Sequence, residues 1–133
     1  DVAWELSYER EKHSISLAIH KSADQLIALQ NKTLPDSVNA DEKTEYIETL
    51  FNINTVDSIL QHNFHIQGHT QPYSFALVNS ETGTIITGSE HTGRISTNPD
   101  FKVSASSNIY PRPLMLHVNM DIRPGIILGR IKI

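Results

Sequence analysis

The sequence predicts an α+β domain in which an N-terminal helical half packs on a C-terminal antiparallel sheet. Three observations predict this class. Apolar residues recur at three- and four-residue spacing in the first half, they alternate with polar residues in much of the second half, and short connections join the strand-like segments. With 133 residues and 38% hydrophobic content, the chain suits one domain with a sizeable core. We therefore expect a single domain with a long helix over 1–31, short helices over 42–66 and five strands over 72–133.

The long helix is predicted by an apolar stripe that most charged residues avoid. The stripe contains Trp4, Tyr8, Ile15, Ala18, Ile19, Leu26 and Leu29. About 28 helical residues make a rod of about 42 Å, whereas a compact chain of this length is about 36 Å across. The rod should therefore project beyond the domain and expose part of its stripe. We expect a homodimer interface at Trp4, Tyr8, Ile15 and Ile19, with a helix packed only on its own sheet as the alternative.

Two short helices are predicted next. Tyr46, Ile47, Leu50 and Phe51 have helical spacing, and so have Val56, Ile59, Leu60 and Phe64. A break is expected around 52–54, with Thr55 as the N-cap of the second helix and Gly68 at its end.

The clearest hairpin signal runs from Tyr73 to Gly88. Its first strand is apolar at nearly every residue, and the segment Asn79 to Gly83 supplies the turn. A strand that is apolar on both faces must be covered on both faces, so it should be central in the sheet. Alternating patterns predict further strands over 101–109 and 114–120, and the turn at 123–125 leads to a fifth strand over 126–133.

Composition and motifs exclude several functions. The net charge of −4 argues against nucleic acid as a partner, and the lack of cysteine excludes disulfides and thiolate catalysis. His62, His65 and His69 form an H-x2-H-x3-H pattern, but without an obvious carboxylate or cysteine partner they favour surface histidines over a metal site. Neither a G-x-S-x-G elbow nor a phosphate-binding loop is present. We therefore expect no catalytic residue, metal or cofactor.

The region to search for a ligand is the polar stretch 89–100 together with 110–112. Binding residues concentrate in long loops over a sheet. His91, Arg94, Tyr110 and Arg112 are the candidates, and the two arginines could clamp an anionic group. A plain surface loop is the alternative.

Both ends of the sequence look interrupted. The chain enters a helical pattern without an initial methionine, and it stops inside the apolar segment 126–133. The expectation is a piece of a longer protein.

Five segments together resemble a known family. They are the helix Trp4–Asn31, VDSILQHNF, YSFALVNSETGTII, LMLHVNM and IILGRIKI. The chain resembles the extracytoplasmic, periplasmic PAS-like sensor domain of a bacterial membrane-bound sensor histidine kinase. The resemblance implies a position between two transmembrane helices, a parent ATP-dependent protein-histidine kinase in the inner membrane, a homodimer, and a cytoplasmic response regulator as partner in a two-component phosphorelay.

The resemblance also has departures and rivals. A PAS domain usually has helical segments between its second and third strands, whereas 89–100 is predicted to be a loop here. A phosphoacceptor motif has an acidic residue directly after its histidine, and none of the histidines in this sequence is followed by one. No catalysis is expected from this chain itself. The signal, a small molecule or a protein, would shift the long helix between two states. The rivals are the sensor domain of a chemoreceptor or cyclase regulator, a non-catalytic dimerisation module, and a small enzyme.

Overall fold

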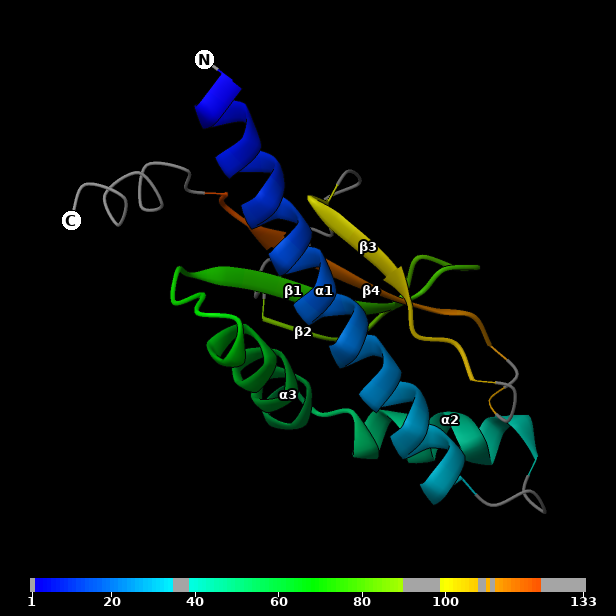
Figure 1. Ribbon diagram of the computed structural model, residues 1–133. Helices are drawn as coiled ribbons and strands as arrows, with labels where there is room; N and C mark the ends of the chain where they lie inside the picture. The colour runs from blue at the N-terminus through cyan, green and yellow to red at the C-terminus, as the bar shows by residue number, and fades with distance from the viewer. Residues whose placement is uncertain (1, 35–38, 90–98, 108–109, 111, 123–133) are drawn as a thin grey trace.

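Three helices precede four strands in the computed structural model, which describes residues 2–34, 39–89, 99–107, 110 and 112–122. The helices are α1 (Val2–Thr33), α2 (Ala40–Leu50) and α3 (Ile53–Ile66). The strands are β1 (Tyr73–Asn79), β2 (Ile85–Gly88), β3 (Phe101–Ser104) and β4 (Leu114–Met120). The predicted α+β class and the order of helices before sheet are confirmed (Figure 1).

The sheet is antiparallel throughout, with strand order β2-β1-β4-β3. Two hairpins therefore meet along β1 and β4, which pair from Tyr73 with Met120 to Asn79 with Leu114. The predicted central place of β1 is confirmed, because β1 has a partner on each side. The two edges of the sheet are β2 and β3.

Two strand predictions need correction or stay open. The strand expected over 101–109 ends at Ser104, although Ala105 still donates its N–H to the carbonyl of Leu114 at 2.9 Å. Side-chain alternation continues past Ser104, so the pattern alone could not locate the end. The fifth strand expected over 126–133 lies outside the described residues, within which the sheet has four strands.

The predicted hairpin turn between β1 and β2 is confirmed. Asn79 donates its N–H to the carbonyl of Thr84 at 2.9 Å, and Gly83 donates to the carbonyl of Asn79 at 2.8 Å. Gly83 has φ +75, in the left-handed region where a Cβ is disfavoured. The glycine at this position therefore fixes where β1 turns back.

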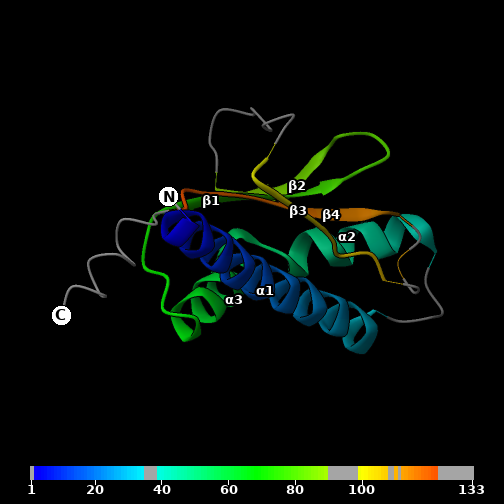
Figure 2. The same cartoon turned by 45° about the horizontal axis from the view of Figure 1, so that its top comes forward.

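All three helices lie against one face of the sheet (Figure 2). Alternate residues of β1 and β4 form the side of the core that faces the helices. They are almost completely buried: Phe75, Leu77, Leu114, Leu116 and Val118. From α1, Ile15, Ile19 and Leu26 belong to the same core. This packing positions α1 along the sheet, and its first turns extend beyond the strands at one end (Figure 1).

The dimer stripe predicted on α1 is wrong for two of its four residues. Ile15 and Ile19 are 0% exposed within the single chain, so their stripe covers the chain's own core. The overhang was expected over 4–12, and Ile15 and Ile19 lie past it, in the part of α1 that packs on the sheet. Tyr8 is half-buried, and the side chain of Trp4 lies outside the described part of the structure. The larger exposed apolar side chains of α1 are Leu6 and Leu17, at 60% and 48% exposure.

The junction between α2 and α3 also differs from the prediction. Asn52, not Thr55, is the N-cap of α3, and its Oδ1 accepts the N–H of Thr55 at 3.0 Å. Both residue types cap helices, so composition could not choose between them. The predicted ending at Gly68 is confirmed by its φ of +82 just after the C-cap Gln67.

Buried polar side chains fasten α1 to its neighbours. Asn63 of α3 donates from Nδ2 to Ser22 Oγ and to Gln25 Oε1, each at 2.9 Å. Gln30 donates from Nε2 to the carbonyl of Ala105 at 2.9 Å, which joins the last turns of α1 to the end of β3. These contacts fix the register of α1 against both α3 and the sheet. In the described residues, no helix combines the length and apolar character of a bilayer span.

Candidate functional site

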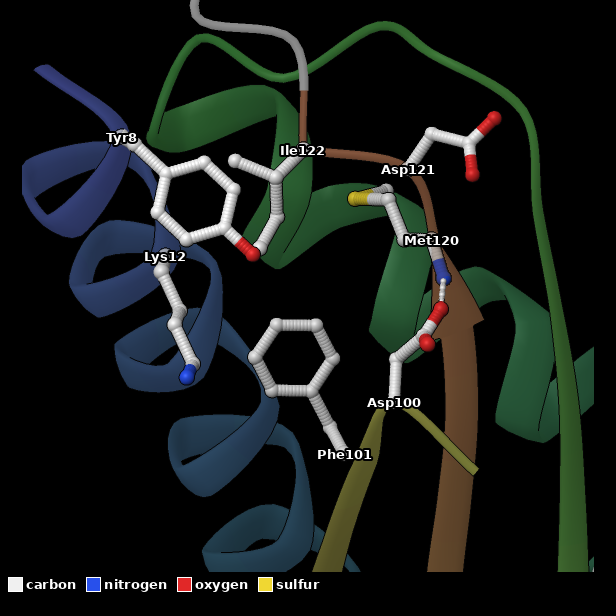
Figure 3. Close-up of a pocket in the computed structure, with 7 residues that line it drawn as sticks. All are labelled: Tyr8, Lys12, Asp100, Phe101, Met120, Asp121 and Ile122. Atoms are coloured by element: carbon white, nitrogen blue, oxygen red, sulfur yellow. Dashed lines mark hydrogen bonds between the residues drawn. The ribbon is translucent and has the colours of Figure 1, made fainter. Parts of the chain in front are cut away.

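A hollow lies between the first half of α1 and one end of the sheet (Figure 3). Its volume is about 360 Å³. We call it the α1–sheet hollow, and its lining is Tyr8, Lys12, Asp100, Phe101, Met120, Asp121 and Ile122. The volume falls within the range of pockets that hold small ligands, roughly 300–1,000 Å³.

The residues that line the hollow are far apart in the sequence and come from α1 and from the adjoining ends of β3 and β4. Tyr8 and Lys12 are four residues apart, so they lie one above the other on α1. Met120 is the last residue of β4, and Phe101, the first residue of β3, pairs in register with Val118. Because β3 and β4 are antiparallel neighbours, the start of one and the end of the other lie side by side below α1.

The carboxylate of Asp100 is held in a fixed place beside the hollow. Its Oδ2 accepts the N–H of Met120 at 3.1 Å, and its own N–H donates to Asn119 Oδ1 at 2.9 Å. This exchange continues the β3–β4 pairing by one residue through side chains. Figure 3 shows the Asp100 carboxylate at the β4 side, whereas the Asp121 carboxylate points away from the centre. Asp100 is therefore the principal anion of this site.

The two walls of the hollow carry opposite charge. Lys12 is exposed on α1, and Asp100 is exposed on the strand side. Between them lie the apolar side chains of Phe101 and Met120, which are 8% and 3% exposed. The arrangement offers one cation, one fixed anion and an apolar floor within a single small cavity.

Two of the four ligand residues predicted from the sequence lie elsewhere. Tyr110 and Arg112 line a second hollow of about 310 Å³ at the opposite end of the strands, beside α2 and the β1–β2 turn. We call it the α2–turn hollow. Arg112 Nη2 lies 4.0 Å from the Asp41 carboxylate, and Glu48 also lines this cavity. These two acidic residues oppose the predicted clamp for an anion. His91 and Arg94 lie outside the described residues, so their part stays a prediction.

Two of the three clustered histidines are exposed, as expected, but His69 is buried. Its Nδ1 lies 2.9 Å from Glu11 Oε1, and its Nε2 lies 2.9 Å from Ser14 Oγ. His69 is 6% exposed, so the prediction of a surface histidine is wrong for this residue. No group of three or more potential metal ligands occurs among the residues that the structure describes.

The Glu11–His69–Ser14 chain has the order of a carboxylate, base and hydroxyl relay. Ser14 lies within α1, and His69 lies just after the C-terminal end of α3, so the hydrogen bonds connect two separate segments. We interpret these contacts as structural, because they join α1 to the turn between α3 and β1.

His117 lies on the sheet face away from the helices, next to Lys102 in register. Burial of the imidazole, followed by the charge of Lys102, lowers the pKa of His117. Folding therefore favours the neutral imidazole. The stability that His117 contributes is fully present above the pKa of the unfolded state, about 6.5, and is lost as the pH falls through the lower pKa of the folded state. We expect His117→Gln to lose less unfolding free energy than wild type between about pH 7.5 and pH 5.

The measurement is urea unfolding at both pH values, with His62→Gln on an exposed face of α3 as the matched control. The control should keep the wild-type pH dependence. An unchanged pH dependence in His117→Gln would contradict the assigned role of this imidazole.

Sequence reasoning missed most of the α1–sheet hollow. Of its seven lining residues only Tyr8 was a named candidate, for a dimer interface, although Asp100 ends the stretch 89–100 that was predicted to hold a ligand. A usable signal did exist. Tyr8 and Lys12 have i, i+4 spacing at the projecting end of the long helix, and Asp100 directly precedes an alternating strand. Their contact depends on strand order, which the sequence pattern left open.

Comparison with protein-family models, curated proteins and solved structures gave no match to this chain.

Proposed function

We propose that this chain is the extracytoplasmic, PAS-like signal-sensing domain of a two-component sensor histidine kinase, and that it detects a small molecule in the α1–sheet hollow. The observation that carries the proposal is the position of this hollow. Its walls are the projecting half of α1 and the adjoining ends of β3 and β4. A ligand bound there would contact both structural layers at once.

Such a position suits signal relay by a change of state. A ligand shifts an equilibrium only by its difference in affinity for the two states. Tyr8 and Lys12 move with α1, whereas Asp100 and Met120 move with the sheet, so a ligand between them favours one spacing of the two layers. The first turns of α1 and the end of β4 lie at the same end of the described structure (Figure 1). That end is where the proposal places the two transmembrane helices of an inner-membrane parent.

The remaining parts of the proposal come from the family resemblance. The parent would be a homodimeric, ATP-dependent protein-histidine kinase whose partner is a cytoplasmic response regulator. The fold is proposed to be PAS-like, with 126–133 as the strand that leads toward the second membrane helix. The dimer contact is proposed for the projecting turns of α1, because Ile15 and Ile19 serve the chain's own core.

The test is thermal unfolding of the purified domain against small metabolites, oligosaccharides and divalent metals. A ligand at about 100 times its dissociation constant adds about 2.7 kcal/mol to the native state, which raises the midpoint by several degrees. We expect at least one stabilising compound. Its effect should be lost in Lys12→Ala, at an exposed lining position, and kept in Lys21→Ala, at an exposed position of α1 away from the hollow. A panel without any stabilising compound would overturn direct chemosensing by this domain.

A further inference from the structure

We propose that the α1–sheet hollow selects a small zwitterion whose ammonium group meets Asp100 and whose carboxylate group meets Lys12. The inference rests on the proposed function, since it names the class of ligand for the same site. Free amino acids with an apolar or aromatic side chain have this chemistry.

The position of the anion is the first part of the argument. Asp100 has one carboxylate oxygen engaged by the Met120 N–H at 3.1 Å, and this bond fixes the plane and direction of the group. The second oxygen is available to a ligand that donates hydrogen bonds. An ammonium group donates up to three, and a hydrogen bond between two charged groups is stronger than a neutral one.

The position of the cation is the second part. Lys12 lies on the opposite wall and is exposed. It has no ion-pair partner within the part of the chain that the structure describes. A ligand carrying only positive charge would be repelled by Lys12, and one carrying only negative charge would be repelled by Asp100. Opposite charges on opposite walls therefore favour a ligand that carries both.

The surface between Asp100 and Lys12 is apolar, which sets a further requirement on the ligand. Phe101 and Met120 form a buried apolar floor, and the Tyr8 ring faces them from α1 (Figure 3). A ligand side chain placed on this floor would gain about 25 cal/mol for each Å² of apolar surface that it buries. The volume of about 360 Å³ suits a single small molecule and is too small for a folded partner.

The test is calorimetric titration of the whole chain with the free amino acids, followed by two blocked forms of the tightest binder. The amide derivative keeps the ammonium and loses the carboxylate, and the N-acetyl derivative keeps the carboxylate and loses the ammonium. We expect each blocked form to bind roughly tenfold more weakly or worse, since each leaves one charged group of the protein unpaired. A blocked form that binds as tightly as the parent amino acid would overturn the inference.

Variants assign the two ends of the ligand. Lys12→Met keeps the apolar stem of the lysine, and Asp100→Asn keeps an oxygen that can accept the Met120 N–H. We expect Lys12→Met to weaken the free amino acid and to leave the amide derivative unaffected or improved, whereas Asp100→Asn should weaken the free amino acid and leave the N-acetyl derivative unaffected or improved. Lys21→Met and Asp24→Asn, on exposed positions of α1, are the matched controls and should bind as wild type does. Equal affinity of Lys12→Met, Asp100→Asn and wild type for the amino acid would contradict the assignment.

The outcome separates this inference from the proposed function. If no amino acid binds, while another class of metabolite stabilises the domain through Lys12, the ligand class is wrong and the sensor proposal stands. If no compound binds at all, both are wrong.

Discussion

Replacing Ile15 by aspartate should unfold the domain, whereas Leu17→Asp should leave it folded. Both residues lie on α1, two positions apart, so the helical surroundings of the introduced aspartate are nearly matched. Ile15 is 0% exposed and belongs to the central core, while Leu17 is 48% exposed. An unpaired carboxylate at the buried position loses its hydration and leaves the apolar contacts of the isoleucine unmade, a cost of about 4 kcal/mol or more.

Circular dichroism and urea unfolding measure this difference. Ile15→Asp should lack a cooperative transition or show one at much lower urea, and Leu17→Asp should unfold within about 1 kcal/mol of wild type. The reverse result, a folded Ile15→Asp that merely loses self-association, would restore the dimer stripe predicted from the sequence and contradict the packing of α1 on its own sheet.

Phe64→Ala should cost about 3–5 kcal/mol of unfolding free energy. Phe64 is 2% exposed, and its ring centroid lies 4.9 Å from that of Tyr73, which in turn lies 6.4 Å from that of Phe75. These rings join α3 to the first strand of the sheet. Removal of the phenyl group leaves a cavity between α3 and the sheet.

Tyr73→Phe is the matched control, because it keeps the ring and removes only the hydroxyl group. That hydroxyl donates to Asp57 Oδ1 at 2.5 Å. Burial, together with this hydrogen bond and the charge of Asp57, raises the pKa of Tyr73 well above its ordinary value, so the neutral donor persists at all moderate pH values. We expect Tyr73→Phe to lose about 1–2 kcal/mol, less than Phe64→Ala. If urea unfolding showed Tyr73→Phe to be the more damaging change, the ring cluster would not be the main link between α3 and β1.

The local structure was largely predictable because each element carries its own signal. The apolar stripe around Ile19 predicts α1, the alternation from Leu114 to Met120 predicts β4, and Gly83 predicts the hairpin turn. Helix and strand periods are set by the backbone, so they survive in any tertiary context. Errors arose where two interpretations share one pattern. A buried stripe on a helix looks the same whether a second copy or the chain's own sheet covers it, as Ile15 illustrates.

The site was much less predictable, because it depends on which strands are neighbours. Asp100 and Met120 are brought together by β3–β4 pairing, and Tyr8 meets them only because α1 crosses that end of the sheet. His69 was equally unexpected, since its partner Glu11 lies far away in the sequence, on α1. Long-range polar contacts leave no periodic trace in a sequence. Tyr110 and Arg112 lie in the α2–turn hollow, beside the acidic residues of α2.

The most direct test of the central claim is an NMR titration that follows backbone amides as a stabilising compound is added. If the α1–sheet hollow is the sensory site, the amides of both its walls should shift together, those of Tyr8 and Lys12 on α1 and those of Phe101 and Met120 on the sheet. Amides around Thr44 and Arg112 in the α2–turn hollow should stay unchanged. Shifts confined to the α2–turn hollow, or shifts on the sheet without any on α1, would contradict the proposal that a ligand bridges the two layers.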